Sequence, residues 1–116
     1  MTRVRFRDWD CIVRKREYAN GRPALVLVDA EDGSPIAAAT VNLPDVTLGR
    51  NQVAIKDWSE NEGLLKALTA AGVVKPTGQT VRSGFVEAPI CELQPPFREA
   101  THAEAVERTR RTPRSR

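Results

Sequence analysis

The sequence predicts an α+β domain in which an antiparallel sheet of about five strands carries one main helix, at about residues 59–71, packed on one face. Two turn signals, Asn20-Gly21 and Asp32-Gly33, separate apolar segments near the N-terminus and predict hairpins. One later segment has helical periodicity, and strand-like segments follow it. The chain has 116 residues, of which 41% are apolar. This length and composition support one hydrophobic core without disulfides or metals.

The first 43 residues are predicted to form a β-meander. Arg3, Arg5 and Arg7 alternate with Val4 and Phe6. Strand geometry would therefore place the three arginines on one face and turn Val4 and Phe6 toward the core. The other strands of this meander are expected at residues 9–18, 24–30 and 35–41.

The clearest single element is the helix over residues 59–71. Ser59 is a suitable N-cap, and Glu62 completes a Ser-x-x-Glu capping box three residues later. Gly72 fits the C′ position after the helix, where a left-handed conformation favours glycine. The apolar face of the helix is formed by Leu64, Leu65, Leu68 and Ala71.

The segments after the helix are expected to return to the sheet. Residues 73–79 are predicted to form a loop, because proline and glycine interrupt them. Residues 80–87 and 89–93 are predicted to form one bent strand or a pair of strands. Pro89 would require an edge position or a bulge, since it cannot donate a backbone hydrogen bond.

The domain is expected to span residues 1–94. Pro95 and Pro96 mark its end, and residues 95–116 are predicted to form an Arg-rich, partly disordered tail. Within this tail, residues 99–110 could form a short helix, although its apolar face is too narrow to keep it folded alone.

No motif in the sequence indicates catalysis. P-loop, dinucleotide-binding, HExxH and GxSxG patterns are all absent. The only histidine, His102, lies in the polar tail, where nothing would hold the geometry that base catalysis needs. Cys11 and Cys91 lie in apolar, strand-like contexts and are predicted to be buried free thiols. We therefore expect no enzymatic activity, no metal and no cofactor.

Charge is distributed unevenly along the chain. The formal net charge is +3, but residues 1–23 carry +4, residues 24–94 carry −4 and residues 95–116 carry +3. Basic ends can neutralise phosphates, although arginine-rich termini also serve simply to keep a small protein soluble. No apolar run approaches the roughly 20 residues that span a membrane, and the N-terminus lacks the pattern of a secretory signal. We therefore expect a cytoplasmic protein without a membrane partner.

The basic segments lead to one functional hypothesis, a nucleic-acid-binding accessory protein. Arginines interleaved with aromatic residues could hold a phosphate backbone and stack on bases. Strand alternation, however, predicts that Phe6 and Trp9 pack in the core, where they could not stack. The candidate nucleic-acid-binding residues are Arg14, Lys15, Arg16, Arg110 and Arg111.

A family resemblance leads to a second hypothesis. The chain resembles a family of small uncharacterised proteins, a domain of unknown function, found on phages, plasmids and integrative elements. The resemblance covers roughly residues 10–94. The segments that carry it are Ile-Lys-Asp-Trp-Ser-Glu-Asn-Glu-Gly at 55–63, Leu-Leu-Lys-Ala-Leu at 64–68, Gly-Val-Val at 72–74, Thr-Gly-Gln at 77–79, Gly-Phe-Val at 84–86 and Pro-Ile-Cys at 89–91.

This resemblance implies an inhibitor of a bacterial defence complex, similar to anti-CRISPR proteins. Such a phage protein would act in the host cytoplasm by stoichiometric binding to a Cas effector or another host defence protein, and would block its access to nucleic acid. Trp58 would either pack beside the helix start or serve as an exposed anchor for the partner. The candidate partner-binding residues are Asp57, Trp58, Glu60, Asn61, Glu31 and Asp32.

Overall fold

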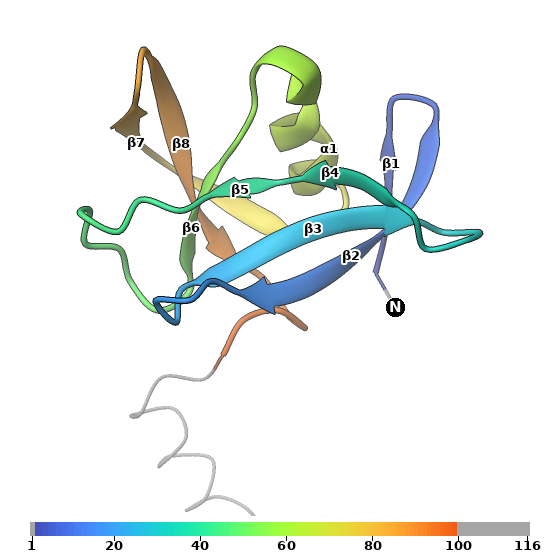
Figure 1. Cartoon of the computed structure of the whole chain (residues 1–116), viewed down its shortest axis with the longest axis horizontal. Coiled ribbons are helices and arrows are strands. Elements are labelled where there is room, and N and C mark those ends of the chain that lie inside the picture. Colours follow the sequence, from blue (N-terminus) through green and yellow to red (C-terminus); the bar gives the residue numbers. More distant parts are fainter. Residues whose placement is uncertain (1, 100–116) are drawn as a thin grey trace, which may run out of the picture.

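The computed structural model describes residues 2–99, which form two antiparallel sheets of four strands each (Figure 1). Sheet 1 contains, in spatial order, β1 (Arg3–Phe6), β2 (Trp9–Glu17), β3 (Pro23–Asp29) and β4 (Pro35–Ala38). Sheet 2 contains, in spatial order, β5 (Thr40–Val41), β6 (Gln52–Ile55), β8 (Val86–Leu93) and β7 (Val74–Ser83). The predicted α+β class is therefore confirmed, whereas the single sheet of about five strands is wrong.

Sheet 1 is the meander that the sequence predicts. Its strands are neighbours in the order in which they occur along the chain. The backbone amide of Tyr18 donates to the carbonyl of Arg22 at 2.8 Å, which closes the turn between β2 and β3. Gly21 and Gly33 have φ angles of 84° and 76°, a region that favours glycine. Both hairpins therefore form where the Asn-Gly and Asp-Gly signals predict them.

The chain passes from sheet 1 to sheet 2 at Ala39, a fully buried residue between β4 and β5. Its backbone amide donates to Leu25 of sheet 1 at 2.9 Å, and its carbonyl accepts from the amide of Lys56 at 2.8 Å, just after β6 of sheet 2. This one residue therefore hydrogen-bonds to both halves of the molecule. The apolar pattern of residues 35–41 continues without interruption, so the change of sheet at Ala39 could not be predicted from it.

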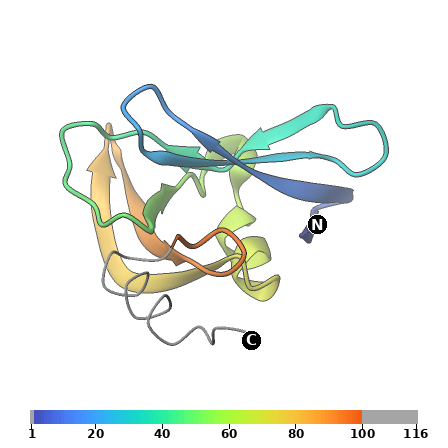
Figure 2. The ribbon, with the colours of Figure 1, turned by 90° about the horizontal axis from the view of Figure 1, so that it is seen from below.

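The hydrophobic core lies between the two sheets (Figure 2). Val4 and Phe6 are buried in it, as predicted, and so are the free cysteines Cys11 and Cys91. Trp9 is an exception, since its side chain is 47% exposed. It pairs with Phe6 at the last register position of the β1–β2 hairpin, so the prediction that Trp9 packs in the core is wrong.

The predicted helix is interrupted near its start. A 3₁₀ turn, η1 (Ser59–Asn61), is followed by α1 (Leu64–Ala70), so one helix over 59–71 is incorrect. Ser59 has a φ of 57° and makes no capping hydrogen bond. Oδ1 of Asp57 instead accepts from the backbone amides of Gly63 at 3.1 Å and Leu65 at 2.9 Å. The predicted capping box is thus replaced by a carboxylate from outside the helix.

The end of α1 agrees with the prediction. Gly72 has a φ of 74°, and its amide donates to the carbonyl of Thr69 at 3.0 Å. The next amide, that of Val73, donates to the carbonyl of Leu68 at 3.0 Å. These two bonds form a Schellman motif, in which glycine at C′ lets the chain reverse and enter β7.

Residues 73–79 were predicted to form a loop, but this prediction is wrong, because residues 74–79 belong to the long strand β7, where Val74, Lys75 and Pro76 pair with β8. The two segments that follow form a pair of strands, not one bent strand, because β7 pairs with β8. Their register shifts between Pro76 and Thr80, and Pro89 pairs with Thr80 at this irregularity. The expectation that Pro89 lies at a bulge is therefore confirmed, even though β8 is a central strand.

The packed unit extends beyond the predicted boundary at residue 94. Phe97 is buried in the core, so residues 95–97 belong to the domain and do not begin a tail. The predicted helix over 99–110 and His102 lie outside the described residues, apart from Glu99. Within residues 2–99, no helix is long and apolar enough to cross a membrane.

Candidate nucleic-acid interface

The outer face of sheet 1 carries a group of exposed arginines. Val4, Phe6, Cys11 and Val13 point into the core, so the alternate positions of β1 and β2 point outward. The β1–β2 register places Arg3 opposite Ile12 and Arg5 opposite Asp10, and Arg14 and Arg16 follow Ile12 on the same face of β2. We call this group the arginine face; its members are Arg3, Arg5, Arg14 and Arg16.

Three members of the arginine face have guanidinium groups that bind no other side chain in the described part of the chain. Arg5 forms an exposed ion pair with Asp10 at 3.1 Å. Within residues 2–99, Arg3, Arg14 and Arg16 form neither an ion pair nor a side-chain hydrogen bond. Unpaired exposed arginines are available for an external anion, because no internal carboxylate must first be displaced.

Aliphatic residues surround these arginines on the sheet. Arg14 lies opposite Val26, and Arg16 lies opposite Ala24. Ile12, on the same face, is buried although it does not belong to the core between the sheets. The neighbours of Arg14 and Arg16 on this face are therefore aliphatic and give no ring on which a base could stack. This composition suits contact with a phosphate backbone.

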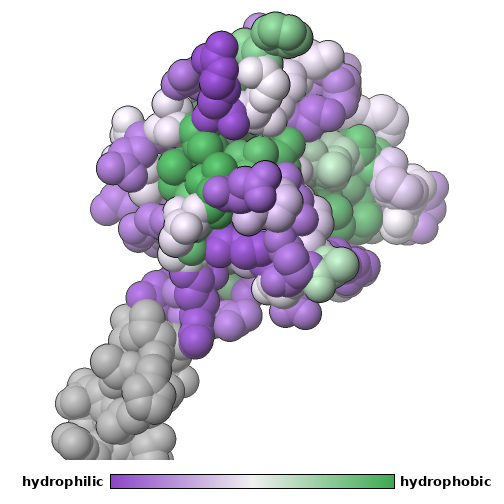
Figure 3. Space-filling model, turned by 60° about the vertical axis from the view of Figure 1, so that its left-hand side comes forward, coloured by the Kyte–Doolittle hydropathy of each residue, from purple (hydrophilic) through white to green (hydrophobic). Residues whose placement is uncertain are grey.

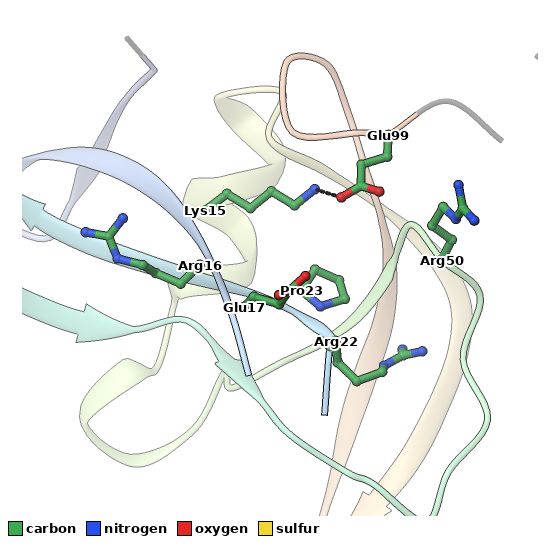
Figure 4. A pocket seen from close by; sticks show the side chains of 8 residues that line it. Lys15, Arg16, Glu17, Arg22, Pro23, Arg50 and Glu99 are labelled. Atoms are coloured by element: carbon green, nitrogen blue, oxygen red, sulfur yellow. Dashed lines mark hydrogen bonds and ion pairs between the residues drawn. The ribbon is translucent and has the colours of Figure 1, made fainter. Parts of the chain in front are cut away.

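A polar pocket of about 380 Å³ adjoins this face at the end of β2 (Figure 4). Lys15 points toward its centre, where Nζ donates to Oε2 of Glu99 at 3.0 Å and to the carbonyl of Phe97 at 2.9 Å. Basic residues in the lining outnumber acidic ones. The lining residues are Lys15, Arg16, Glu17, Gly21, Arg22, Pro23, Arg50 and Glu99.

Two of these basic residues, Arg22 and Arg50, were not predicted from the sequence. Arg22 donates to the carbonyls of Leu48 at 2.9 Å and Gln52 at 3.3 Å, which anchors the loop before β6 to the β2–β3 turn. Arg50 helps to lower the pKa of Glu99, so its charge acts on this pocket. Both residues lie in segments that connect strands. They line the same pocket only because distant parts of the chain pack together, which no local sequence pattern indicates.

The predicted nucleic-acid-binding residues are only partly brought together. Arg14 and Arg16 share the arginine face, whereas Lys15, between them on β2, points to the other side and enters the pocket. Arg16 contributes to the lining of that pocket as well. Arg110 and Arg111 lie outside the described residues.

Two of the predicted partner-binding residues have structural roles. Asp57 caps α1, as described above. Asn61 is only 2% exposed, and its Nδ2 donates to the carbonyl of Ala38 at 2.8 Å, which ties η1 to the end of β4. Trp58, beside them, is half-buried. These side chains stabilise the fold, and only part of this segment reaches the surface.

The remaining acidic candidates lie on separate parts of the molecule. Glu60 is exposed, and Lys56 lies 2.7 Å away. The hydrogen bond from Lys56 is the main cause that lowers the pKa of Glu60 to about 2. Glu31 and Asp32 occupy the β3–β4 turn, which lies away from the start of α1 in both ribbon views (Figures 1 and 2). The structure therefore does not assemble the predicted acidic residues into one surface.

The described residues offer little for metal or thiol chemistry. No group of three or more histidine, cysteine, aspartate or glutamate side chains is placed to hold a metal ion within residues 2–99. Burial raises the pKa of the Cys91 thiol to about 11 and also raises that of Cys11. Both thiols are therefore protonated at neutral pH and enclosed in the core.

Comparisons with known proteins return no match: no family model, no curated protein and no solved structure corresponds to this chain. The resemblance over residues 10–94 thus stays a prediction, and the function is inferred from the geometry of the arginine face and its adjoining pocket.

Proposed function

We propose that this protein binds nucleic acid through the phosphate backbone, as an accessory protein of a mobile element. The observation that carries the proposal is the arginine face, where Arg3, Arg14 and Arg16 are exposed and unpaired within the described residues. Phosphates are the natural ligands of such a surface, because guanidinium groups donate paired hydrogen bonds to them.

The spacing of these arginines supports contact with a strand of phosphates. Arg14 and Arg16 are two positions apart on β2, which corresponds to about 6.7 Å in an extended strand. Arg3 lies on the neighbouring strand β1, opposite Ile12. Because phosphates carry no sequence information, binding at this face would discriminate little between base sequences.

The distribution of charge along the chain favours β1 and β2 as the binding strands. Residues 1–23 carry a charge of +4 and contribute both β1 and β2, whereas residues 24–94 carry −4. A bound polyanion would therefore be attracted mainly to β1 and β2, since the β3–β4 turn of the same sheet carries the acidic residues Glu31 and Asp32. Arg110 and Arg111 would add to this attraction in the same proposal.

A paired charge reversal tests the proposal. Binding of fluorescent single- and double-stranded oligonucleotides is measured by anisotropy over a range of salt concentrations for the wild type and for Arg14→Glu/Arg16→Glu. We expect the double variant to lose at least about tenfold in affinity, and the slope of log K against log salt to fall by about one for each arginine.

The matched control reverses two exposed lysines elsewhere, Lys66 on α1 and Lys75 on β7. Lys66→Glu/Lys75→Glu changes the net charge by the same amount, so it should weaken binding by less than about threefold if the contact is local to sheet 1. Equal losses in both double variants, or no binding by the wild type, would contradict the proposal.

A protein-binding inhibitor of a host defence complex is the second candidate, favoured by a different part of the surface. Phe85, at the tip of the β7–β8 hairpin, is fully exposed. Figure 3 shows apolar side chains gathered near the centre of one face, with hydrophilic side chains around them. Protein interfaces commonly combine an apolar centre, aromatic anchors and a polar rim.

A pull-down from a defence-active bacterial lysate, with and without nuclease, distinguishes the two candidates. Recovery of Cas subunits that resists nuclease and is lost in Phe85→Ala and in Glu31→Lys/Glu60→Lys would support the inhibitor. Recovery that disappears with nuclease would support nucleic-acid binding instead. Retained recovery in both variants would exclude the predicted acidic contacts.

A further inference from the structure

The pocket at the end of β2 contains a carboxylate from the end of the described chain. Glu99 reaches into it and pairs with Lys15 at 3.0 Å (Figure 4). Arg50 approaches from the other side in the same view. The hydrogen bond and charge of Lys15, with a smaller contribution from Arg50, lower the pKa of Glu99. An anion is therefore already stabilised at this position.

The backbone of Glu99 is held in place by one side chain. Asn51 donates from Nδ2 to the carbonyl of Glu99 at 2.7 Å, and its Oδ1 accepts from the amide of Glu99 at 2.7 Å. Lys15 also donates to the carbonyl of Phe97, two residues earlier. Because these hydrogen bonds fix the backbone of Glu99, its carboxylate is held at the pocket, although the side chain remains largely exposed.

The pocket is larger and more basic than one carboxylate requires. Its volume of about 380 Å³ falls in the range of small-ligand sites. Lys15, Arg16, Arg22 and Arg50 line it, against Glu17 and Glu99. A phosphate group in its place would bring nearly twice the charge and three acceptor oxygens, and could accept from two cations at once.

We propose that the position of the Glu99 carboxylate, between Lys15 and Arg50, is a site for a terminal phosphate group, for which Glu99 is the internal competitor. Resting on the proposed function, this inference names the ligand as the 5′-phosphate of a nucleic acid whose backbone follows the arginine face. Arg16 supports that path, because it contributes to both the face and the pocket lining. Arg22 adds positive charge, while two of its donors bind the carbonyls of Leu48 and Gln52.

The test compares Glu99→Gln with Glu17→Gln. Both residues line the pocket and both substitutions remove one negative charge, but only Glu99 contacts Lys15. Affinities are measured for the same single-stranded oligonucleotide with a 5′-phosphate and with a 5′-hydroxyl. We expect Glu99→Gln to increase the preference for the 5′-phosphate by about fivefold or more, as for two ligands that compete for one site. Glu17→Gln should change this preference by less than about twofold.

A second measurement separates this inference from the proposed function. Inorganic phosphate is titrated into Glu99→Gln and into Lys15→Gln/Glu99→Gln, and the amide resonances around Lys15 and Arg50 are followed by NMR. Saturable shifts that disappear with the Lys15 substitution support the site, even if no oligonucleotide binds. The inference would be overturned if Glu99→Gln increased the affinity for both oligonucleotides equally and inorganic phosphate caused no saturable shifts.

Discussion

The two sheets share one core but use their charged residues differently. In sheet 1, Arg3, Arg14 and Arg16 extend outward without an ion pair in the described part of the chain. In sheet 2 and its helix, charged side chains serve the fold, since Asp57 caps α1 and Lys56 pairs with Glu60. Sheet 1 therefore presents three unpaired arginines on one face within the described residues, whereas Asp57, Lys56 and Glu60 hold the irregular connection between β6 and α1.

This difference in charge does not imply two separate folding units. Core residues of both sheets belong to one cluster, and Ala39 is hydrogen-bonded to both. We therefore expect the sheets to unfold together, even though only one of them is proposed to contact the ligand.

The largest expected effect is the loss of a core side chain from sheet 1. Leu25 is fully buried, so Leu25→Ala should lower the free energy of unfolding by about 2–5 kcal/mol. Trp9 of β2 and Trp58, just after β6, allow each sheet to be followed by fluorescence in the variants Trp58→Phe and Trp9→Phe. With Leu25→Ala in either background, both probes should report the same shifted denaturation midpoint.

Phe85→Ala is the control for this large-to-small change. Its side chain is fully exposed, so the free energy of unfolding should change by less than about 0.5 kcal/mol. A shift of the Trp9 transition alone after Leu25→Ala would show that the sheets are separable units.

The sequence predicted sheet 1 better than sheet 2 for a physical reason. The turns of sheet 1 are encoded by adjacent residues, such as Asn20 and Gly21, and each strand pairs with its neighbour in sequence. In sheet 2, β6 pairs with β8 across the intervening helix and β7. Pairings of this kind depend on distant packing, so the switch at Ala39 and the start of β7 carry no local signal.

The next effect in size concerns the bond that joins η1 to sheet 1. Removing the side chain in Asn61→Ala leaves the carbonyl of Ala38 without this donor and opens a small cavity. We expect a loss of about 1–3 kcal/mol in the free energy of unfolding, measured by urea denaturation. Asn42→Ala removes an exposed hydrogen bond to Asn20 and should cost only a few tenths of a kcal/mol. If the two variants lost the same free energy of unfolding, the buried hydrogen bond of Asn61 would stabilise the fold no more than an exposed one.

The same residue shows why the candidate sites were predicted only in part. Asn61 lies in a polar segment with Glu60 and Glu62, which a sequence pattern assigns to the surface. Asn61 is buried because it binds the carbonyl of Ala38, which is distant in sequence. No residue next to Asn61 in the sequence indicates this contact. The outward positions of Arg14 and Arg16, in contrast, can be predicted from the alternation of a regular strand, and the structure was needed only to show that they form no ion pair within residues 2–99.

The smallest effect is expected from the exposed ion pair at the start of the helical segment. The pKa of Glu60 is lowered from its ordinary value of 4.5 to about 2, mainly by the hydrogen bond from Lys56 and also by hydrogen bonds from its own backbone amide and from Ser59. Because the folded-state pKa lies below that of the unfolded chain, the pair stabilises the fold above about pH 4.5. This contribution decreases as the pH falls from about 4.5 to about 2.

The difference in unfolding free energy between the wild type and Glu60→Gln measures this contribution directly. This difference should be largest at neutral pH and decrease as the pH falls from about 4.5 to about 2. High salt should decrease it further, since the Glu60 side chain is 66% exposed. Glu31→Gln, which removes an exposed carboxylate of the β3–β4 turn that forms no ion pair within residues 2–99, is the matched control. A difference for Glu60→Gln that stays constant from pH 7 to pH 2 would mean that Lys56 does not stabilise the charged form. Sheet 2 would then not owe its irregular connection to this pair, and the capping by Asp57 and the buried bond of Asn61 would have to hold it alone.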